Sequence, residues 1–175
     1  MPEEGAACAA PSIGPNYYYY YAIEMELFGT CNLAAILNQN HALTKPQCLC
    51  YLRDILKALS FLHDKKVAHY DLTPRNCLLD TRTHKVKVCD LGKVRVPEEG
   101  EHCGSYGYMP LEVLNTAFEL PTVRLDIWSA GVILWEMAVG KPFLNPRDLE
   151  GDDGRQKAEK LLLKLTPADD AAKYV

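Results

Sequence analysis

Three side chains with hard oxygen ligands follow one another closely in the sequence: Asp71, Asn76 and Asp90. Carboxylate and amide oxygens suit Mg²⁺, which keeps waters and completes its shell with substrate phosphates. A carboxylate beside a metal-bound phosphate can orient a hydroxyl group and accept its proton. The set therefore favours metal-assisted chemistry on a phosphate, with Asn76 and Asp90 near the metal and Asp71 beside it.

A short hairpin is expected to bring these side chains together. Residues 77–79 and 86–88 are strand-like and flank a polar turn at 80–84, which is typical of a β-hairpin. Because a hairpin brings its two ends together, Asn76 and Asp90 can face one another.

Two helices are predicted on either side of this region. Thr44 as N-cap, Pro46 in the first turn and Gln47 at the capping-box position indicate a helix start. A stripe of apolar residues follows at three- and four-residue spacing, up to about His63: Leu49, Leu52, Ile55, Leu56, Leu59 and Leu62. Residues 126–139 are apolar on every face, which predicts a helix inside the protein that ends at Gly140.

Composition limits the remaining possibilities. The 175 residues, 48% of them apolar, fit one domain with a real core. The formal net charge of −4 excludes the basic surface that binds nucleic acid or an anionic membrane. Seven cysteines without a C-x-x-C pair indicate neither a disulfide framework nor a zinc site. With no signal sequence or apolar span in view, we expect a soluble, intracellular protein in the cytoplasm.

Four motifs, taken in order, resemble the C-terminal lobe of a eukaryotic-type protein kinase. H-x-D-L-x-x-x-N at 69–76 and D-x-G at 90–92 are similar to the catalytic-loop and metal-loop pair of that family. Residues 104–112 look like the end of its activation segment, and 126–131 like the start of its buried central helix. The resemblance implies a mainly α fold with a small β-hairpin region (α+β), built around that helix, with a residual strand and hinge from the N-terminal lobe.

The same resemblance implies an ATP:protein phosphotransferase that uses Mg-ATP, with a protein substrate or partner. Asp71 would be the catalytic base, and Asn76 and Asp90 would hold Mg²⁺. Pro74 and Ser105 favour the Ser/Thr type; nearby Arg75 is shared with tyrosine kinases.

Nucleotide contacts are implied in the same way. Leu78 would form the floor of the adenine pocket, and Met25 would be the gatekeeper residue. The backbones of Glu26 and Phe28 would face adenine, and Asn32 would lie near the ribose.

The expected domain organisation is a disordered leader at 1–16 and a truncated kinase-like domain at 17–175, with the last N-lobe strand and hinge at 17–29 and the C-lobe at 30–175. The first lysine, Lys45, follows the hinge, and no Gly-rich loop precedes it. The alternative function is therefore a pseudokinase-like or truncated lobe that binds partners without turnover.

Several residues depart from the family pattern or have structural interpretations. Tyr70 replaces an arginine and Thr73 a lysine of the family's catalytic loop. His69 is expected to be a core histidine supporting the loop. Asp126 is either a helix N-cap or the holder of the catalytic-loop backbone. Glu112 would pair with Lys173.

The same stretch also has the residue types of a different kind of site. His69 and Asp71, with His84 or His102, mimic the two-histidine, one-carboxylate triad of iron oxygenases. Such sites usually belong to a β-sandwich, whereas helices are predicted on both sides of this motif.

Overall fold

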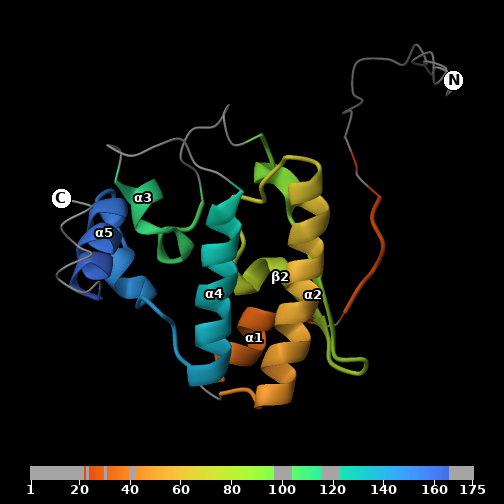
Figure 1. Ribbon diagram of the computed structural model, residues 1–175. Coiled ribbons are helices and arrows are strands. Elements are labelled where there is room, and N and C mark those ends of the chain that lie inside the picture. Colours follow the sequence, from red (N-terminus) through yellow and green to blue (C-terminus); the bar gives the residue numbers. More distant parts are fainter. Residues whose placement is uncertain are drawn as a thin grey trace, which may run out of the picture.

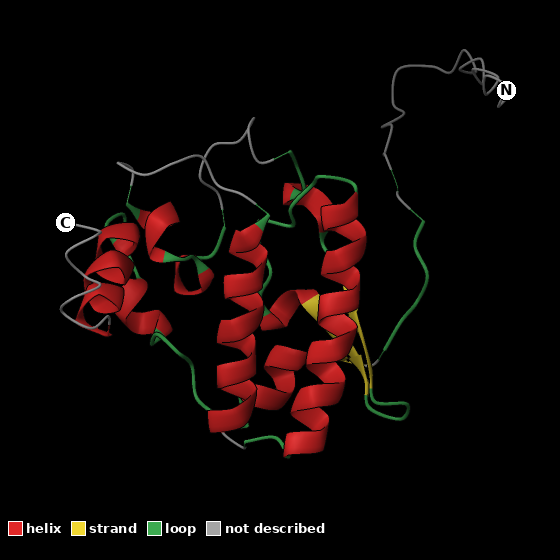
Figure 2. Ribbon diagram, viewed as in Figure 1, coloured by secondary structure: helices red, strands yellow, loops and turns green. Residues whose placement is uncertain are grey.

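The computed structural model describes residues 22, 24–29, 31–39, 42–96, 104–115 and 123–165. Two long helices, α2 (Lys45–Asp64) and α4 (Arg124–Val139), run side by side through the molecule (Figure 1). A small antiparallel sheet packs against α2, in the order β1 (Cys31–Asn32), β2 (Cys77–Asp80) and β3 (Lys85–Val88) (Figure 2). The mainly helical α+β fold and the predicted hairpin are thus confirmed.

The shorter elements complete the description. Helix α1 (Leu33–Leu37) precedes α2, while α3 (Leu111–Leu114) and α5 (Gly154–Leu165) pack on one another beside α4 (Figure 1). Short 3-10 turns lie in the described connections: η1 (Pro74–Asn76), η2 (Leu91–Lys93), η4 (Tyr106–Tyr108) and η5 (Pro146–Leu149). The turn η1 leads directly into β2, and η2 follows Asp90.

Helix α2 begins as its sequence predicts, but it buries only part of the predicted apolar stripe: Ile55, Leu59 and Leu62. Gln47 Oε1 accepts hydrogen bonds from the Thr44 backbone N–H, at 3.0 Å, and from the Thr44 hydroxyl, at 2.8 Å. Leu49 and Leu56 of the predicted stripe are exposed. The buried face, also spaced by threes and fours, is Cys48, Tyr51, Ile55, Leu59 and Leu62. Both faces carry apolar residues, so periodicity alone could not show which one meets the core.

Helix α4 is central but is not buried on every side. It ends at Gly140, whose φ of 72° gives the expected left-handed C-cap. Ile133 and Met137 are fully buried, whereas Trp128 and Trp135 remain partly exposed. The expectation that every face is buried is wrong for the described residues, because α2 and the catalytic loop cover only one side of the helix.

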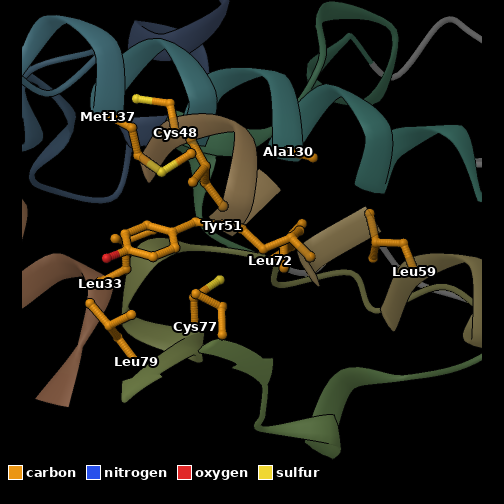
Figure 3. Close-up of a cluster of buried hydrophobic side chains, with 12 residues drawn as sticks. Leu33, Cys48, Tyr51, Leu59, Leu72, Cys77, Leu79, Ala130 and Met137 are labelled. Carbon is orange, nitrogen blue, oxygen red and sulfur yellow. The ribbon is translucent and has the colours of Figure 1, made fainter. Parts of the chain in front are cut away.

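Two clusters of buried side chains hold the fold together. The larger lies between α2, α4 and the sheet, and Figure 3 shows Tyr51, Leu72 and Met137 meeting within it. The smaller lies between α3, α5 and the catalytic loop, and it includes Tyr70 and Ala158. The catalytic loop contributes Leu72 to one cluster and Tyr70 to the other, so it is packed from both sides.

The segment expected to hold the last N-lobe strand and the hinge, residues 17–29, forms no strand where it is described. Residues 24–29 have no strand pairing, and Figure 1 shows them extending away from the helices. Met25 is 81% exposed and Leu27 is 98% exposed. No described strand lies beside this segment to accept its backbone hydrogen bonds, which is the physical reason for the difference.

Some predictions fall outside the described residues. These are the leader at 1–16, the tyrosine-rich start of the expected strand at 17–21, His102, and Lys173 as the partner of Glu112. Within the described part of the chain, no helix combines the length and apolar character needed to cross a membrane.

Candidate active site

The catalytic loop is anchored by a buried carboxylate from α4. Asp126 is fully buried, and its two oxygens accept hydrogen bonds from the backbone N–H groups of His69, at 2.8 Å, and Tyr70, at 3.1 Å. The Nε2 of His63, on α2, lies 2.9 Å from Asp126 Oδ2. Asp126 lies inside the first turn of α4 and is not its N-cap, so the second of the two interpretations, a holder of the loop backbone, is confirmed.

These bonds explain an unusual backbone conformation. Tyr70 has a φ of 65°, in the left-handed region that non-glycine residues rarely adopt. Its N–H is held by Asp126, its ring is buried, and the Arg95 guanidinium lies 5.7 Å from the ring centroid. Such conformations persist where surrounding contacts determine them, often at functional sites.

His69 connects the catalytic loop to the segment that carries Asp90. The imidazole is fully buried, its Nδ1 accepts from the Asp71 N–H at 3.3 Å, and its Nε2 lies 3.0 Å from the Cys89 carbonyl oxygen. Because Nδ1 accepts, Nε2 carries the proton and donates it to that oxygen. His69 is therefore a supporting core histidine, as predicted, and it couples the position of Asp71 to that of Asp90.

The carboxylate of Asp71 is held at both oxygens. Oδ2 lies 2.9 Å from the Lys93 ammonium, and Oδ1 accepts from the Ser105 hydroxyl at 2.9 Å. Gly104 allows this approach, because a Cβ at that position would clash with the backbone carbonyl oxygen of Tyr70. Loops far apart in the sequence thus converge on one oriented carboxylate.

Asn76 and Asp90 have the features expected of ligands for a hard metal ion. Asn76 donates its Nδ2–H to the backbone carbonyl of Asp71 at 2.8 Å, and the backbone carbonyl of Asn76 accepts from the Cys89 N–H at 2.9 Å. No hydrogen bond from the described residues reaches its Oδ1. Asp90 is exposed, with a φ of 62°, and its Oδ1 accepts one long bond of 3.4 Å from the Gly92 N–H. An amide oxygen and a carboxylate with spare capacity fit Mg²⁺.

The predicted nucleotide residues are only partly brought together. Asn32 and Leu78 are direct neighbours across the β1 and β2 pair. Asn32 Oδ1 accepts from the Ala35 N–H at 3.0 Å, so it caps α1. Glu26 forms an ion pair with Lys87, whose ammonium also lies 4.6 Å from the centre of the Phe28 ring.

Met25 differs from the expectation. The side chain is exposed to solvent and does not form the wall of a pocket, because no described element packs over it. A gatekeeper role needs such packing, and the described residues do not supply it. The nucleotide roles of the other residues in this group stay predictions.

Two cysteines near the site have thiols with a raised pKa. Burial raises the pKa of Cys77 to about 12, and burial followed by the neighbouring Asp90 carboxylate raises the pKa of Cys89. Since the thiolate is the reactive form, both cysteines are expected to act as inert packing residues.

A cavity of about 360 Å³ opens beside Ser105, the residue that donates to the Asp71 carboxylate. Ser105 lies on its wall together with Thr73 from the catalytic loop. Glu136 of α4 also lines it, but its carboxylate accepts from the Tyr108 hydroxyl at 2.9 Å and the Phe143 N–H at 3.0 Å. Burial raises the pKa of Glu136 despite these two bonds. The full lining is Ala34, Leu37, Asn38, Thr73, Pro74, Arg75, Ser105, Tyr106, Gly107, Tyr108, Glu136, Lys141, Pro142, Leu144, Pro146 and Leu149.

The iron-triad interpretation conflicts with the geometry. Both ring nitrogens of His69 are engaged by backbone groups, and His84 Nδ1 lies 3.1 Å from the Tyr51 hydroxyl. Among the described residues, no three His, Cys, Asp or Glu side chains gather into a metal site. His69 is thus committed to structure and has no nitrogen left for iron.

Sequence reasoning missed two features of this site. Lys93 had no recognised role, although it forms the ion pair with Asp71. The cavity was also missed, since its walls come from segments between α1 and η5 that meet only in the folded chain. The sequence does show that Lys93 follows the D-x-G motif at 90–92. No rule of residue spacing, however, predicts that its ammonium group lies beside Asp71.

Comparison with known proteins agrees with the geometry. The family model described as "Protein kinase domain" matches residues 14–172. The chain belongs to the protein kinase family. This confirms the resemblance inferred from the motifs, and it accounts for the long helices beside an anchored catalytic loop.

Curated relatives share part of the chain at moderate identity. A Drosophila melanogaster protein described as "Death-associated protein kinase related" is 39% identical over 129 residues, covering 70% of this chain and 19% of the relative. "Mitogen-activated protein kinase 6" of Arabidopsis thaliana is 35% identical over 130 residues, covering 72% of this chain and 32% of the relative. The chain therefore spans between about a fifth and a third of the lengths of these relatives.

Proposed function

We propose that this chain is an ATP:protein phosphotransferase of the Ser/Thr type, acting on Mg-ATP and a protein substrate, with Asp71 as the general base. The observation that carries the proposal is the Asp71 carboxylate, oriented at both oxygens next to two candidate metal ligands, Asn76 and Asp90. The kinase names of the relatives support the same reaction class.

The metal would be held by Asn76 Oδ1 and the Asp90 carboxylate, and when bound it supplies positive charge to the phosphate oxygens. The other proposed steps, positioning the hydroxyl and accepting its proton, belong to residues of this chain. Asp71 positions the hydroxyl of a substrate serine or threonine and accepts its proton as the oxygen attacks the terminal phosphorus of ATP. The bond from that phosphorus to the bridging oxygen breaks, and its electron pair leaves with ADP.

Lys93 and Ser105 prepare Asp71 for this role. Their bonds hold the carboxylate in one orientation, which lowers the reorganisation required when the hydroxyl arrives. Ser105 also lines the adjoining cavity, so the hydroxyl group to be phosphorylated and the residues next to it in the substrate would enter from that side.

The direct test is phosphorylation of a generic protein substrate by the full chain with Mg-ATP. Replacing the base in Asp71→Asn is expected to lower the rate by about two to four orders of magnitude. Lys57→Glu, a charge change at an exposed residue of α2, serves as the control and is expected to match the wild type. A wild-type rate no higher than that of Asp71→Asn, at any enzyme concentration, would remove the proposal.

A second candidate function is a pseudokinase-like or truncated lobe that binds partners without turnover. Its support is the absence of lysine and arginine from the first 44 residues, so no lysine of this sequence precedes the hinge to grip ATP phosphates. This function predicts protein binding with no Mg-ATP-dependent transfer, and Asp71→Asn would then bind the same partner equally well.

We infer an intracellular location for either function. The described cysteines are all free thiols: Cys31, Cys48, Cys50, Cys77 and Cys89. Free thiols in this number fit a reducing compartment. Labelling of the chain with a thiol reagent after isolation under oxidising conditions tests this, since extensive disulfide formation in the native protein would contradict it.

A further inference from the structure

The 360 Å³ cavity adjoins the place where the hydroxyl of a substrate would meet Asp71, because Ser105 touches both. The Ser105 hydroxyl donates a hydrogen bond to Asp71 Oδ1, at 2.9 Å, and Ser105 also forms part of the cavity wall. Thr73, Pro74 and Arg75 of the catalytic loop form the adjacent wall. A polypeptide whose hydroxyl reaches Asp71 must therefore place side chains next to this hydroxyl in or over the cavity.

Among the described residues that line the cavity, the charges are unbalanced. Arg75 and Lys141 line it, and both residues are exposed. Glu136, the acid among the described lining residues, is buried, and its oxygens accept hydrogen bonds from the Tyr108 hydroxyl and the Phe143 N–H. Its carboxylate is therefore engaged by these two donors, and it forms no ion pair with Arg75 or Lys141 among the described residues.

The remaining walls are mostly apolar, and nearby acids lie outside them. Pro142, Leu144 and Leu149 form one side of the cavity. Asp148 and Glu150 lie on the same stretch of chain as η5, but neither lines the cavity. A ligand that fits is thus a chain segment with apolar atoms along the wall and a carboxylate directed to the guanidinium and the ammonium.

We propose that this cavity selects substrate segments in which an aspartate or glutamate lies close to the phosphoacceptor, with its carboxylate bound by Arg75 and Lys141. The proposal rests on the proposed function for the identity of the ligand as a substrate. The selectivity itself is a property of the cavity and can be measured by binding alone.

The test uses fluorescent peptides with a central serine in a neutral, partly apolar context. Glutamates flank the serine on both sides in the first peptide, glutamines in the second and lysines in the third. Fluorescence anisotropy with the full chain measures the dissociation constants. At low salt we expect the glutamate peptide to bind about threefold to tenfold tighter than the glutamine peptide, and the lysine peptide to bind weakest. The preference should shrink at high salt, because exposed charges are screened.

A charge reversal separates recognition from folding. The double variant Arg75→Glu with Lys141→Glu is expected to reverse the order, so that the lysine peptide binds tightest. A variant that had merely lost its fold would bind all three peptides poorly, whereas reversal requires a folded cavity. Lys57→Glu, on a face of α2 outside the cavity, is the matched control and is expected to keep the wild-type order.

The outcomes for the cavity and for catalysis are distinct. Equal binding of the three peptides by the wild type, no binding of any, or an unchanged order in the double variant would overturn the proposed selectivity, even if phosphotransfer occurs. A glutamate preference that reverses in the double variant supports it, even if Mg-ATP yields no phosphoserine. In that last case the proposed catalysis fails while the binding site remains.

Discussion

The catalytic loop and the hinge segment at 24–29 are both expected to serve the same reaction, yet this chain supports them very differently. The loop is held by Asp126 and His69, both fully buried, and its side chains pack into both hydrophobic clusters. The hinge segment has two large apolar side chains, Met25 and Leu27, almost entirely in solvent. The residues proposed for proton transfer and metal binding are thus held by buried contacts, whereas the described contacts of the hinge segment, those of Glu26 and Phe28 with Lys87, lie at the surface.

Left-handed backbone conformations illustrate the same difference. Tyr70 reaches a φ of 65° because Asp126 binds its N–H and the core holds its ring. Gly29, where the hinge joins β1, has a φ of 70° and needs no such support, because glycine has no Cβ. Surrounding contacts thus stabilise the positive φ of Tyr70 in the loop. At Gly29 the missing Cβ makes the same conformation accessible without them.

Removing the anchor of the catalytic loop should have the largest effect. Asp126→Ala leaves the N–H groups of His69 and Tyr70 buried without an acceptor, and we expect a loss of about 3 to 5 kcal/mol in the free energy of unfolding. Urea denaturation followed by circular dichroism measures it. Asp126→Asn keeps one acceptor oxygen and should lose less. Equal stability of Asp126→Ala and wild type would show that the anchoring is not needed.

A substitution at the base of the hinge should have an intermediate effect. In Gly29→Ala the new Cβ would lie 2.6 Å from the Leu79 carbonyl oxygen, on a backbone with positive φ. We expect a loss of about 1 to 3 kcal/mol in the same measurement. Gly131→Ala on α4 is the matched control, since its Cβ meets no atom within 4 Å and alanine favours helices, so it should be neutral or stabilising. A neutral Gly29→Ala would mean that β1 is not held against β2.

The buried carboxylate of the cavity predicts a smaller, pH-dependent effect. Burial raises the pKa of Glu136 in the folded chain above its unfolded value, so the unfolded state ionises first as the pH rises. The stability contributed by this group is therefore present below the unfolded pKa and is lost as the pH rises through the folded pKa. Glu136→Gln keeps the size of the side chain and lacks the titration.

The free energy of unfolding of Glu136→Gln, minus that of wild type, should thus rise as the pH goes from acidic to neutral. Thermal unfolding of both proteins across pH 4 to 8 measures this difference, and effects of the other carboxyl groups cancel in the comparison. A constant difference at every pH would contradict the raised pKa.

The smallest effect is expected in the exposed hinge. Leu27→Ser removes an apolar side chain that is 98% exposed, so the free energy of unfolding should stay within about 0.5 kcal/mol of wild type. Leu59→Ser, at a fully packed position of α2, is the contrasting control and should lose several kcal/mol. A large loss in Leu27→Ser would mean that the hinge segment packs against part of the protein and would remove the contrast between the two regions.

Much of the fold was predictable from local signals. The capping residues of α2, the glycine that ends α4 and the polar turn of the hairpin each act over a few neighbouring residues, so their effects are visible in the sequence. The buried face of α2 was predicted only in part, since Ile55, Leu59 and Leu62 are buried but Leu49 and Leu56 are not. Leu49 and Leu56 are as apolar as Leu59, and only the position of α4 and the sheet decides which of them is covered.

The sequence by itself determined the family and singled out the residues proposed to carry the chemistry, because Asp71, Asn76 and Asp90 lie in motifs whose order and spacing identify that family. Tertiary structure decided how they are held and what surrounds them. The ion pair of Lys93 with Asp71 and the cavity lined by Arg75 and Lys141 join segments from distant parts of the chain. Such contacts depend on how the elements pack together, and no local pattern of residue types specifies them.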